Sequence, residues 1–246
     1  MSIPSKAANR RIGQAMHDFA MLSESDRVLI AVSGGVDSLV LTWILNYWIH
    51  KAPIRYDILA IYLDNGFDCQ TAEMVAEQLR KIGVPFLIEK TDFWHRASEA
   101  EDGKSTCYHC ARMRRNRLFA LAREQGFNKI AFGHHKDDIL ETFFLNLLYA
   151  GNISTMVPKQ KLFNGCLHII RPMAYLEKKD ILEIASDSSI IPVKNPCPMD
   201  RASKRREVRK ILDLLVQLDP KVKSNIFSAL SNIRHDYLLH CFQKKL

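Results

Sequence analysis

Short runs of apolar residues alternate with longer stretches of helical periodicity over the first 150 positions. The apolar runs lie at 27–32, 56–63, 85–90 and 129–133, and helical patterns follow at 37–49, about 70–82, 108–125 and 136–149. Each run is rich in Ile, Val, Leu and Phe and is closed by a polar residue or a glycine, as strands buried on both faces usually are. The alternation predicts βαβ units and therefore an α/β fold with a doubly wound, mostly parallel sheet.

The regular alternation ends near residue 150, and the rest of the chain has a different character. It contains, in order, a loop with Gly151 and Gly165, a helical pattern at 178–187, a proline-bearing loop at 190–200, and helical stretches at about 203–218 and 221–238. The pattern predicts three segments: an N-terminal helical segment over 1–26, an α/β domain over 27–195, and a small helical, basic C-terminal extension over 196–246.

Polar and glycine-bearing loops follow three of the predicted strands, at 33–38, 64–67 and 133–138. Ligands of open parallel sheets bind beyond the carboxyl ends of the strands, where such loops meet. We therefore expect these three loops to converge on one site.

Composition narrows the class of protein. No stretch of the 246 residues approaches the roughly 18 to 20 consecutive apolar positions of a membrane-spanning helix. The N-terminal residues do not have the pattern of a targeting segment, so we expect a cytoplasmic protein with no membrane partner. The net charge of +8 and the pI of about 9.2 favour a polyanionic partner. Six cysteines in a chain of this kind indicate reduced thiols, metal ligands or catalysts rather than a disulfide framework.

The sequence SGGVDS, from Ser33 to Ser38, links the first predicted strand to its helix. Its two glycines permit a tight turn and a close approach of the backbone to a ligand, while the serines and the N–H groups at the helix start suit an anion such as a phosphate. The longer Walker loop and the G-x-G-x-x-G pattern are both absent. Taken alone, the sequence is explained equally well by a capped strand-to-helix turn.

A second motif, GHHKDDILET, begins at Gly133 and places His134, His135, Asp137 and Asp138 at the end of the fourth predicted strand. These side chains are suited to orienting a ligand and moving protons, although paired histidines are often structural and acids at a helix start are favoured by its dipole. Asp37 is a suitable magnesium ligand, because Mg²⁺ prefers carboxylate and phosphate oxygens.

The two motifs together resemble the PP-loop ATP pyrophosphatase superfamily, which has the adenine nucleotide alpha hydrolase-like fold. The resemblance implies cleavage of ATP between its α and β phosphates and transfer of AMP to a carbonyl oxygen. It implies catalytic roles for Asp37, His135 and Asp138, with Mg²⁺ as a cofactor. The residues implied to hold ATP are Ser33, Gly34, Gly35, Asp37, Ser38, Asp64, Gly133 and His134.

Cys107 and Cys110 form a C-x-x-C pair that is followed at once by basic residues, namely Arg112, Arg114, Arg115 and Arg117. This spacing fits zinc, a redox dithiol or an iron–sulfur site. Cys197, in the sequence NPCPMD, is a third candidate ligand because the flanking prolines stiffen its loop. The remaining thiols have no comparable context and are interpreted as buried or incidental: Cys69, Cys166 and Cys241.

The C-x-x-C pair, the arginines, GHHxDDILxTxFLN, IRPMAY and the lone downstream cysteine together resemble the tRNA 2-thiocytidine synthetase (TtcA) family, over about residues 12 to 235. The resemblance implies that Cys107, Cys110 and Cys197 hold a 4Fe-4S cluster with one iron free of protein ligands. It implies adenylation of the 2-oxo group of a cytidine in tRNA, at position 32, and its replacement by sulfur. A cysteine desulfurase or other sulfur donor and a homodimer are further implications.

One departure from the family and several alternatives accompany this hypothesis. The family's usual loop is SGGKDS, whereas this chain has Val36, so one phosphate-facing cation is lost. Lysidine synthetase-like chemistry, an iron-independent persulfide sulfurtransferase, and an RNA-binding module with a relic nucleotide site are the alternatives. The basic helical segment is expected to meet tRNA phosphates or to form a solvated face, through Lys204, Arg205, Arg206, Arg209 and Lys210.

Overall fold

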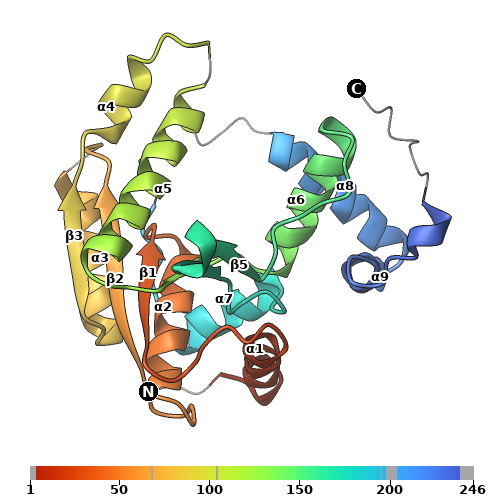
Figure 1. Ribbon diagram of the computed structural model, residues 1–246, viewed down its shortest axis with the longest axis horizontal. Helices are drawn as coiled ribbons and strands as arrows, with labels where there is room; N and C mark the ends of the chain where they lie inside the picture. Colours follow the sequence, from red (N-terminus) through yellow and green to blue (C-terminus); the bar gives the residue numbers. More distant parts are fainter. Residues whose placement is uncertain (1–3, 68, 104, 195, 198–203, 239–246) are drawn as a thin grey trace. The chain divides into compact units, whose positions relative to one another are not determined.

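The computed structural model describes residues 4–67, 69–103, 105–194, 196–197 and 204–238 (Figure 1). The chain groups into two compact units, Met1–Ile139 with Met156–Ala202 and Leu140–Thr155 with Ser203–Leu246. Residues 140–155 therefore group with the C-terminal helices rather than with the sheet. The boundary expected between 195 and 196 lies at a residue outside the described part of the chain, and the three predicted segments stay a prediction.

The first unit is built on a six-stranded sheet in the order β3-β2-β1-β4-β6-β5. All neighbouring strands run parallel except β5 and β6, which are antiparallel. The strands are β1 Asp26–Val32, β2 Tyr56–Asp64, β3 Phe86–Lys90, β4 Lys129–Ala131, β5 Lys159–Leu162 and β6 Leu167–Ile170. Since β2 and β4 lie on opposite sides of β1, the chain reverses its winding there, which is where open α/β sheets bind ligands. The predicted α/β fold is confirmed.

Helices cover both faces of this sheet (Figure 1). They are α1 Lys6–Asp18, α2 Val36–Ile49, α3 Cys69–Ile82, α4 Phe93–Ser98, α5 Thr106–Glu124, the first turn of α6 Lys136–Tyr149, and α7 Lys178–Asp187. One core packs the sheet against α1, α2, α3 and α7, and a second core packs the other face against α4 and α5. Helix α2 is apolar on all sides because both the sheet and other helices surround it.

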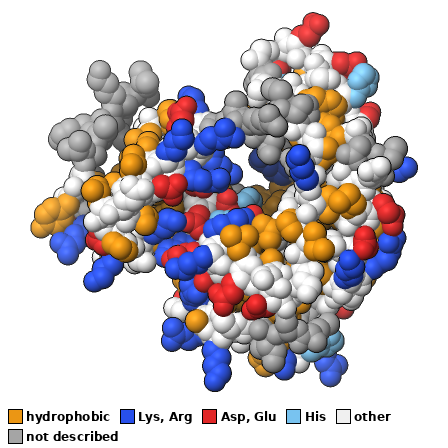
Figure 2. All heavy atoms as spheres, turned by 180° about the vertical axis from the view of Figure 1, so that it is seen from behind, with side chains coloured by type: hydrophobic (Ala, Val, Ile, Leu, Met, Phe, Trp, Pro, Cys, Tyr) orange, Lys and Arg blue, Asp and Glu red, His pale blue; other side chains and the backbone are white. Residues whose placement is uncertain are grey.

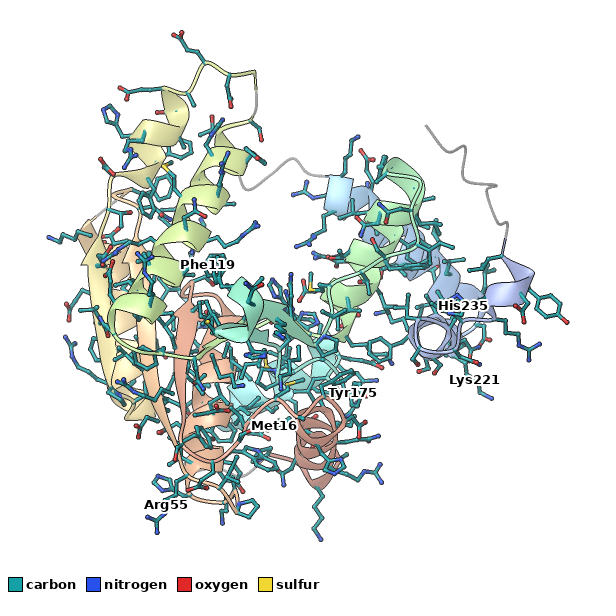
Figure 3. All side chains as sticks on the ribbon, in the orientation of Figure 1. Met16, Arg55, Phe119, Tyr175, Lys221 and His235 are labelled. Carbon is teal, nitrogen blue, oxygen red and sulfur yellow. The ribbon has the colours of Figure 1, made fainter. Side chains whose placement is uncertain are left out.

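The N-terminal helix is fastened to the segment around α7. The ring of Tyr175 packs edge-on against Phe19, and its hydroxyl donates to the Asp18 carboxylate at 3.0 Å. Arg11 forms an ion pair with Asp180 at 2.8 Å. Figure 3 shows Tyr175 beside α1, which carries Met16. The helical character expected of residues 1–26 is thus observed in α1, and its contacts hold it against the sheet's first core.

Three details of the predicted elements were wrong. The region treated as a loop around Gly165 forms the hairpin of β5 and β6, joined by a short 3-10 turn at Phe163–Gly165. Its four-residue strands carry too little apolar periodicity to be recognised, and pairing of β6 with β4 stabilises them. Helix α4 also went unpredicted, and the last predicted helix, 221–238, is shorter, since α9 spans Val222–Ala229.

The second unit is helical. It contains α6 from Leu140 onward, α8 Lys204–Leu218, α9 and a 3-10 turn at His235–Tyr237. Its core is formed by Leu140, Val208 and Leu212, against which aromatic and aliphatic side chains of α6 and α9 pack. Residue 203, where the predicted helix over 203–218 begins, lies outside the described residues.

Within the described residues, none of the helices combines the length and the apolar character that crossing a bilayer requires. In the space-filling view, Lys and Arg side chains are interspersed with acidic and hydrophobic ones over the visible face (Figure 2). The basic net charge is therefore spread over this face together with acidic groups.

The core packing generates the first testable prediction. Ile44 on α2 is fully buried, so we expect Ile44→Ala to lower the free energy of unfolding by about 2–5 kcal/mol through lost burial and a residual cavity. Leu182→Ala on α7 is the matched control, because that side chain is 52% exposed, and we expect a change within about 0.5 kcal/mol. Urea unfolding followed by circular dichroism measures both. Equal destabilisation by the two variants would contradict this description of the core.

Candidate active site

The loop after β1 makes a tight, internally hydrogen-bonded turn. Gly34 has a φ of +84°, which favours glycine, and a Cβ there would lie 2.9 Å from Val75 Cγ2. The Ser33 N–H donates to Ser38 Oγ at 3.1 Å, and the Ser38 hydroxyl donates to the Gly35 carbonyl at 2.9 Å. Gly35 is the N-cap of α2 and offers no side-chain cap. The N–H groups at the start of α2 therefore have no side-chain cap, and together with the short, rigid loop they are suited to binding an anion.

Gly133 brings the second motif against this loop. A Cβ at Gly133 would stand 2.9 Å from both the carbonyl carbon and the carbonyl oxygen of Asp37 and 3.0 Å from the Ser38 nitrogen. These are backbone atoms, so no side-chain movement relieves the collision. Glycine is required here because the segment after β4 passes directly over the first turn of α2. The expected convergence of 33–38 and 133–138 is thus observed.

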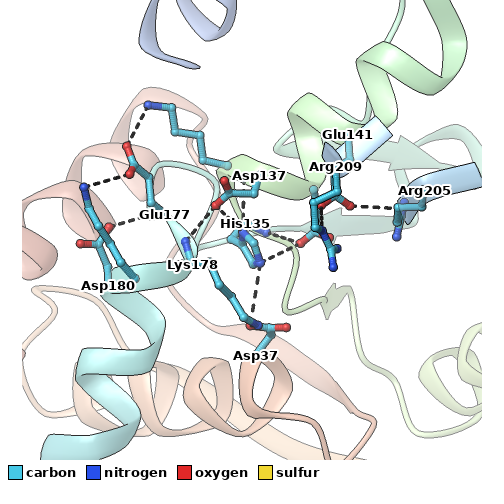
Figure 4. A network of polar contacts seen from close by, with 12 residues as sticks. Asp37, His135, Asp137, Glu141, Glu177, Lys178, Asp180, Arg205 and Arg209 are labelled. Atoms are coloured by element: carbon cyan, nitrogen blue, oxygen red, sulfur yellow. Dashed lines mark hydrogen bonds and ion pairs between the residues drawn. The ribbon is translucent and has the colours of Figure 1, made fainter. Parts of the chain in front are cut away.

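His135 is buried among three carboxylates, drawn in Figure 4 with its contacts. Its Nε2 lies 3.3 Å from Asp138 Oδ2 and 3.8 Å from Asp37 Oδ1, and its Nδ1 lies 3.3 Å from Asp137 Oδ2. Burial by itself lowers the pKa of the imidazole, but the hydrogen bond to Asp137 and the charges of Asp138 and Asp37 outweigh it and raise the pKa above its usual value. The site therefore favours an imidazolium, a group able to stabilise negative charge or to donate a proton.

Asp137 and Asp138 also have backbone partners, as acids at a helix start often do. Asp138 Oδ2 accepts the His135 N–H at 3.0 Å, and Asp137 Oδ2 accepts the Lys178 N–H at 2.8 Å. The second contact ties the first turn of α7 to the first turn of α6. Both acids are thus held in place, and the structural and the chemical interpretations of this pair apply together.

Lys178 is a site residue that the sequence interpretation missed. Its Nζ lies 2.5 Å from Asp37 Oδ1, although the two residues are 141 positions apart. Figure 4 shows Lys178 reaching Asp37 from the start of α7. The IRPMAY motif that precedes this helix was the available signal, because it marked the region as part of the family pattern.

His134 is paired with another unpredicted residue. Arg171 Nε donates to His134 Nδ1 at 3.2 Å, and Arg171 Nη1 donates to the Val157 carbonyl at 2.5 Å. Burial lowers the pKa of the Arg171 guanidinium to about 10, although the negative charge of Asp138 raises it in part. Arg171, the residue directly after β6, thus fixes the orientation of His134 and adds a positive charge next to it.

Asp64 closes β2 at the same edge of the sheet. Its side chain is buried and accepts the Gly66 N–H at 3.0 Å, while its carbonyl accepts both the N–H and the hydroxyl of Thr91 at 2.8 Å. Phe67, three residues after Asp64, packs in a tilted arrangement against Trp94, with ring centroids 4.9 Å apart. These contacts stabilise the turn that follows β2, and the assignment of Asp64 to ligand binding stays a prediction.

Two of the three candidate cysteine ligands, Cys107 and Cys110, lie in the first turns of α5. Cys107 is exposed in the first turn, where Ser105 caps the helix by accepting the Tyr108 N–H at 3.3 Å; Cys110 is half-buried, and Cys197 is partly exposed. Burial raises the pKa of the Cys110 thiol, Arg114 lowers it, and the charges of Cys197 and Cys107 raise it further. Cys197 therefore acts electrostatically on Cys110 of the C-x-x-C pair.

Of the other three cysteines, the structure describes the side chain of Cys166 alone. Cys166 is exposed directly after the 3-10 turn of the β5–β6 hairpin. The side chain of Cys69 and the whole of Cys241 lie outside the described residues. Over the part of the chain that is described, no group of three or more His, Cys, Asp or Glu side chains is arranged as a metal site. The three thiols nonetheless offer the soft donor set that iron–sulfur clusters prefer.

The arginines after Cys110 divide into two kinds. Arg117 makes a two-pronged ion pair with Glu89, at 2.6 and 2.8 Å, and also reaches Glu124 at 3.0 Å, so it fastens α5 to β3. Arg114 is close enough to lower the pKa of Cys110. Arg114 therefore provides positive charge near the Cys110 thiol, whereas Arg117 has a structural role.

Some of the basic side chains of α8, in the second unit, also form contacts that stabilise the fold. The carboxylate of Glu141 is buried and pairs with Arg209 at 2.7 Å and with Arg205 at 3.5 Å. The ammonium of Lys204 lies 4.4 Å from the ring centroid of Tyr149. Arg206 and Lys210 are exposed, and among the described residues no ion pair engages either of them.

Comparisons with known proteins agree on one group. A family model described as a PP-loop domain matches residues 4–215. The proteins similar to this chain include tRNA-cytidine(32) 2-sulfurtransferases from three bacteria. That of Citrifermentans bemidjiense is 36% identical over 93% of this chain and 91% of the relative. The Geobacter sulfurreducens protein is 35% identical over 95% and 92%, and the Alcanivorax borkumensis protein is 37% identical over 93% and 81%.

Solved structures share the fold. The U34-tRNA thiolase NcsA of Methanococcus maripaludis, described with its [4Fe-4S] cluster, superposes with a TM-score of 0.77 at 22% identity, covering 96% of this chain and 80% of that one. The NH3-dependent NAD synthetase of Campylobacter jejuni has a TM-score of 0.55 at 15% identity, with 98% and 100% covered. At these identities the likeness demonstrates a common α/β architecture.

The contact of Gly133 with α2 generates the second prediction. Gly133→Ala forces its Cβ against backbone atoms of Asp37 and Ser38, so we expect it to lower the free energy of unfolding by about 1–3 kcal/mol. Gly35→Ala is the control, because a Cβ there makes an ordinary contact at 3.5 Å with Ser33 Oγ, and we expect a change within about 1 kcal/mol. Thermal and urea unfolding measure both variants. If Gly133→Ala unfolds like the wild type, the close packing described here is wrong.

Proposed function

The chain belongs to the family of tRNA-cytidine(32) 2-sulfurtransferases, and we propose that it is an ATP-dependent enzyme that replaces the 2-oxo group of cytidine 32 in tRNA by sulfur. The match extends over more than nine-tenths of the chain and of the Citrifermentans and Geobacter relatives. The observation that carries the proposal is the presence in one unit of a tight phosphate-type loop beside a buried histidine and of three neighbouring thiols.

The loop from Ser33 to Ser38 binds the phosphates of ATP in this proposal. Its backbone N–H groups and the α2 N-terminus supply the donors, and Asp37 would hold Mg²⁺, which favours carboxylate with phosphate oxygens. The 2-oxo oxygen of the cytidine attacks the α-phosphorus, the bond from that phosphorus to the bridging oxygen breaks, and pyrophosphate leaves. Adenylation converts a poor leaving oxygen into AMP.

His135 acts on the charge that develops in this step. Its raised pKa favours the imidazolium, and Nε2 faces Asp37 and Asp138 at the mouth of the loop. An imidazolium in this position stabilises negative charge on the phosphates. Asp138 orients the ring through the contact of its carboxylate with His135 Nε2, and Arg171 holds His134 by donating to its Nδ1.

The three thiols fit a 4Fe-4S cluster by their chemistry and proximity. Cys107 and Cys110 come from one helical turn, Cys197 approaches them, and Arg114 provides a nearby positive charge. When bound by three cysteines, such a cluster supplies one iron without a protein ligand, where sulfur for the transfer can be held. The half-burial of Cys110 limits solvent access to this place.

We assign three partners to the reaction: tRNA, a cysteine desulfurase or other sulfur donor, and a second copy of the chain in a homodimer. Arg206 and Lys210 are the basic residues of α8 proposed to contact tRNA phosphates, because Arg205 and Arg209 are engaged by Glu141. We propose that the thiolation of tRNA takes place in the cytoplasm.

Iron and acid-labile sulfide in the anaerobically purified protein test the cluster. We expect about four of each per chain, lost in Cys197→Ala, and the variant should form no 2-thiocytidine in tRNA by mass spectrometry. Cys166→Ala is the matched control, because its thiol is exposed outside the group, and it should keep both iron and activity. Thiolation that persists after complete removal of iron would favour the persulfide alternative, and lysine incorporation would favour lysidine synthesis.

The division of the basic residues on α8 gives another prediction. We expect Arg206→Ala with Lys210→Ala to weaken tRNA binding and to reduce the slope of log K against log salt by about 1.5, for two lost phosphate contacts. Arg209→Ala is the comparison, because it removes the partner of Glu141, and its main effect should be on stability. Filter binding at several salt concentrations measures the slopes. An unchanged slope in the double variant would assign this face to solvent.

A further inference from the structure

Position 36 of the phosphate loop carries no charge. The side chain of Val36 packs on the first hydrophobic core, so the loop SGGVDS itself offers no cation to a ligand. The bound phosphates of ATP bring several negative charges to this loop, and their stabilisation requires cations nearby. The structure must therefore supply that charge from another element or do without it.

The neighbouring cations have other partners. The carboxylate of Glu177 is shared by Lys136, at 3.4 Å, and Lys179, at 3.0 Å. Burial alone would raise the pKa of Glu177, but these two ammonium groups hold it below its usual value. Arg171 is turned toward His134 and the Val157 carbonyl. These three cations are thus engaged by Glu177, by His134 and by the Val157 carbonyl.

Lys178 is directed toward the loop. Its Nζ pairs with Asp37 at 2.5 Å, and 43% of its side chain is exposed, so a ligand bound at Asp37 can reach it. Its backbone is fixed, because its N–H donates to Asp137 and because Glu177 and Asp180 cap α7 reciprocally. A mobile ammonium thus extends from an anchored backbone into the site.

The place of Lys178 in its helix is unfavourable for a cation. It is the first residue of α7, where the helix dipole favours negative charge and opposes a lysine. Lys178 therefore does not stabilise α7 through its charge, and its ammonium instead contacts Asp37. An incoming phosphate would meet the Lys178 ammonium, because the Lys178 N–H and the capped donors of α7 already have carboxylate partners.

We propose that Lys178 supplies to the phosphates of ATP the positive charge that the loop from Ser33 to Ser38 lacks, and that its pair with Asp37 is the resting contact. With ATP and Mg²⁺ bound, Asp37 would hold the metal, and the ammonium released from Asp37 would contact phosphate oxygens. Lys178 is thus a substrate-binding residue contributed by α7. The inference rests on the proposed function only in taking ATP as the ligand.

Nucleotide binding to the full-length protein, measured by calorimetry without tRNA, tests this assignment. We expect Lys178→Met to weaken binding of ATP with Mg²⁺ at least about tenfold, as loss of one charged hydrogen bond does. Binding of AMP, which lacks the β and γ phosphates, should change less than about twofold. Lys178→Arg should keep most of the ATP affinity. Lys179→Met is the matched control, because that ammonium pairs with Glu177 and its side chain is 75% exposed.

A charge transplant sharpens the test. The double variant Val36→Lys with Lys178→Met should regain most of the ATP affinity, because the cation returns from the other side of the loop. Equal loss of ATP and AMP binding in Lys178→Met, or tighter binding of ATP, would overturn the assignment. Because tRNA is absent, this outcome is separate from the proposed function: a protein that binds ATP through Lys178 but forms no 2-thiocytidine would refute only the latter.

Discussion

The site depends on one close contact between backbones, that of Gly133 with the first turn of α2. The atoms that a Cβ would meet belong to the main chain of Asp37 and Ser38, so the two motifs approach as near as polypeptide allows. Pairing of β1 with β4 brings the two loops to the same edge of the sheet, and this contact sets how closely the loops approach each other. His135 reaches Asp37 only because Gly133 precedes it by two residues along the same segment.

Burial of charge follows from this geometry. Placing His135 between Asp37, Asp137 and Asp138 in a largely solvent-excluded place is unfavourable for each carboxylate unless cations and backbone donors compensate. The raised pKa of the imidazole is one compensation, and the N–H groups of His135 and Lys178 are another. The acids are therefore ordered before any ligand arrives, which reduces the reorganisation that binding and catalysis require.

The sheet and its converging loops were predictable because their signals are local. Strands β1 and β2 are continuous apolar runs, and parallel strands necessarily bring the loops after Val32 and Ala131 to one edge. The β5–β6 hairpin was not predictable, because KQKL and LHII are four-residue strands whose stability comes from pairing with each other and with β4. Lys178 was not predicted for a similar reason. Its contact with Asp37 depends on how α7 packs against the sheet. The preceding IRPMAY motif marks the region but does not encode that packing.

The basic composition has a more specific meaning once each cation is placed. Arg117 holds α5 to β3, and Arg205 and Arg209 form ion pairs with the buried Glu141, so these residues stabilise the fold rather than meet a ligand. A cation whose partner is a buried carboxylate cannot leave without exposing that charge to an apolar surrounding. Lys178 differs, because its partner Asp37 is itself a residue that a metal would engage, and the exchange leaves neither charge uncompensated. In the proposal made for Lys178, the cation acts on a polyanion because its resting partner can change, and a count of arginines and lysines does not distinguish that case from structural pairing.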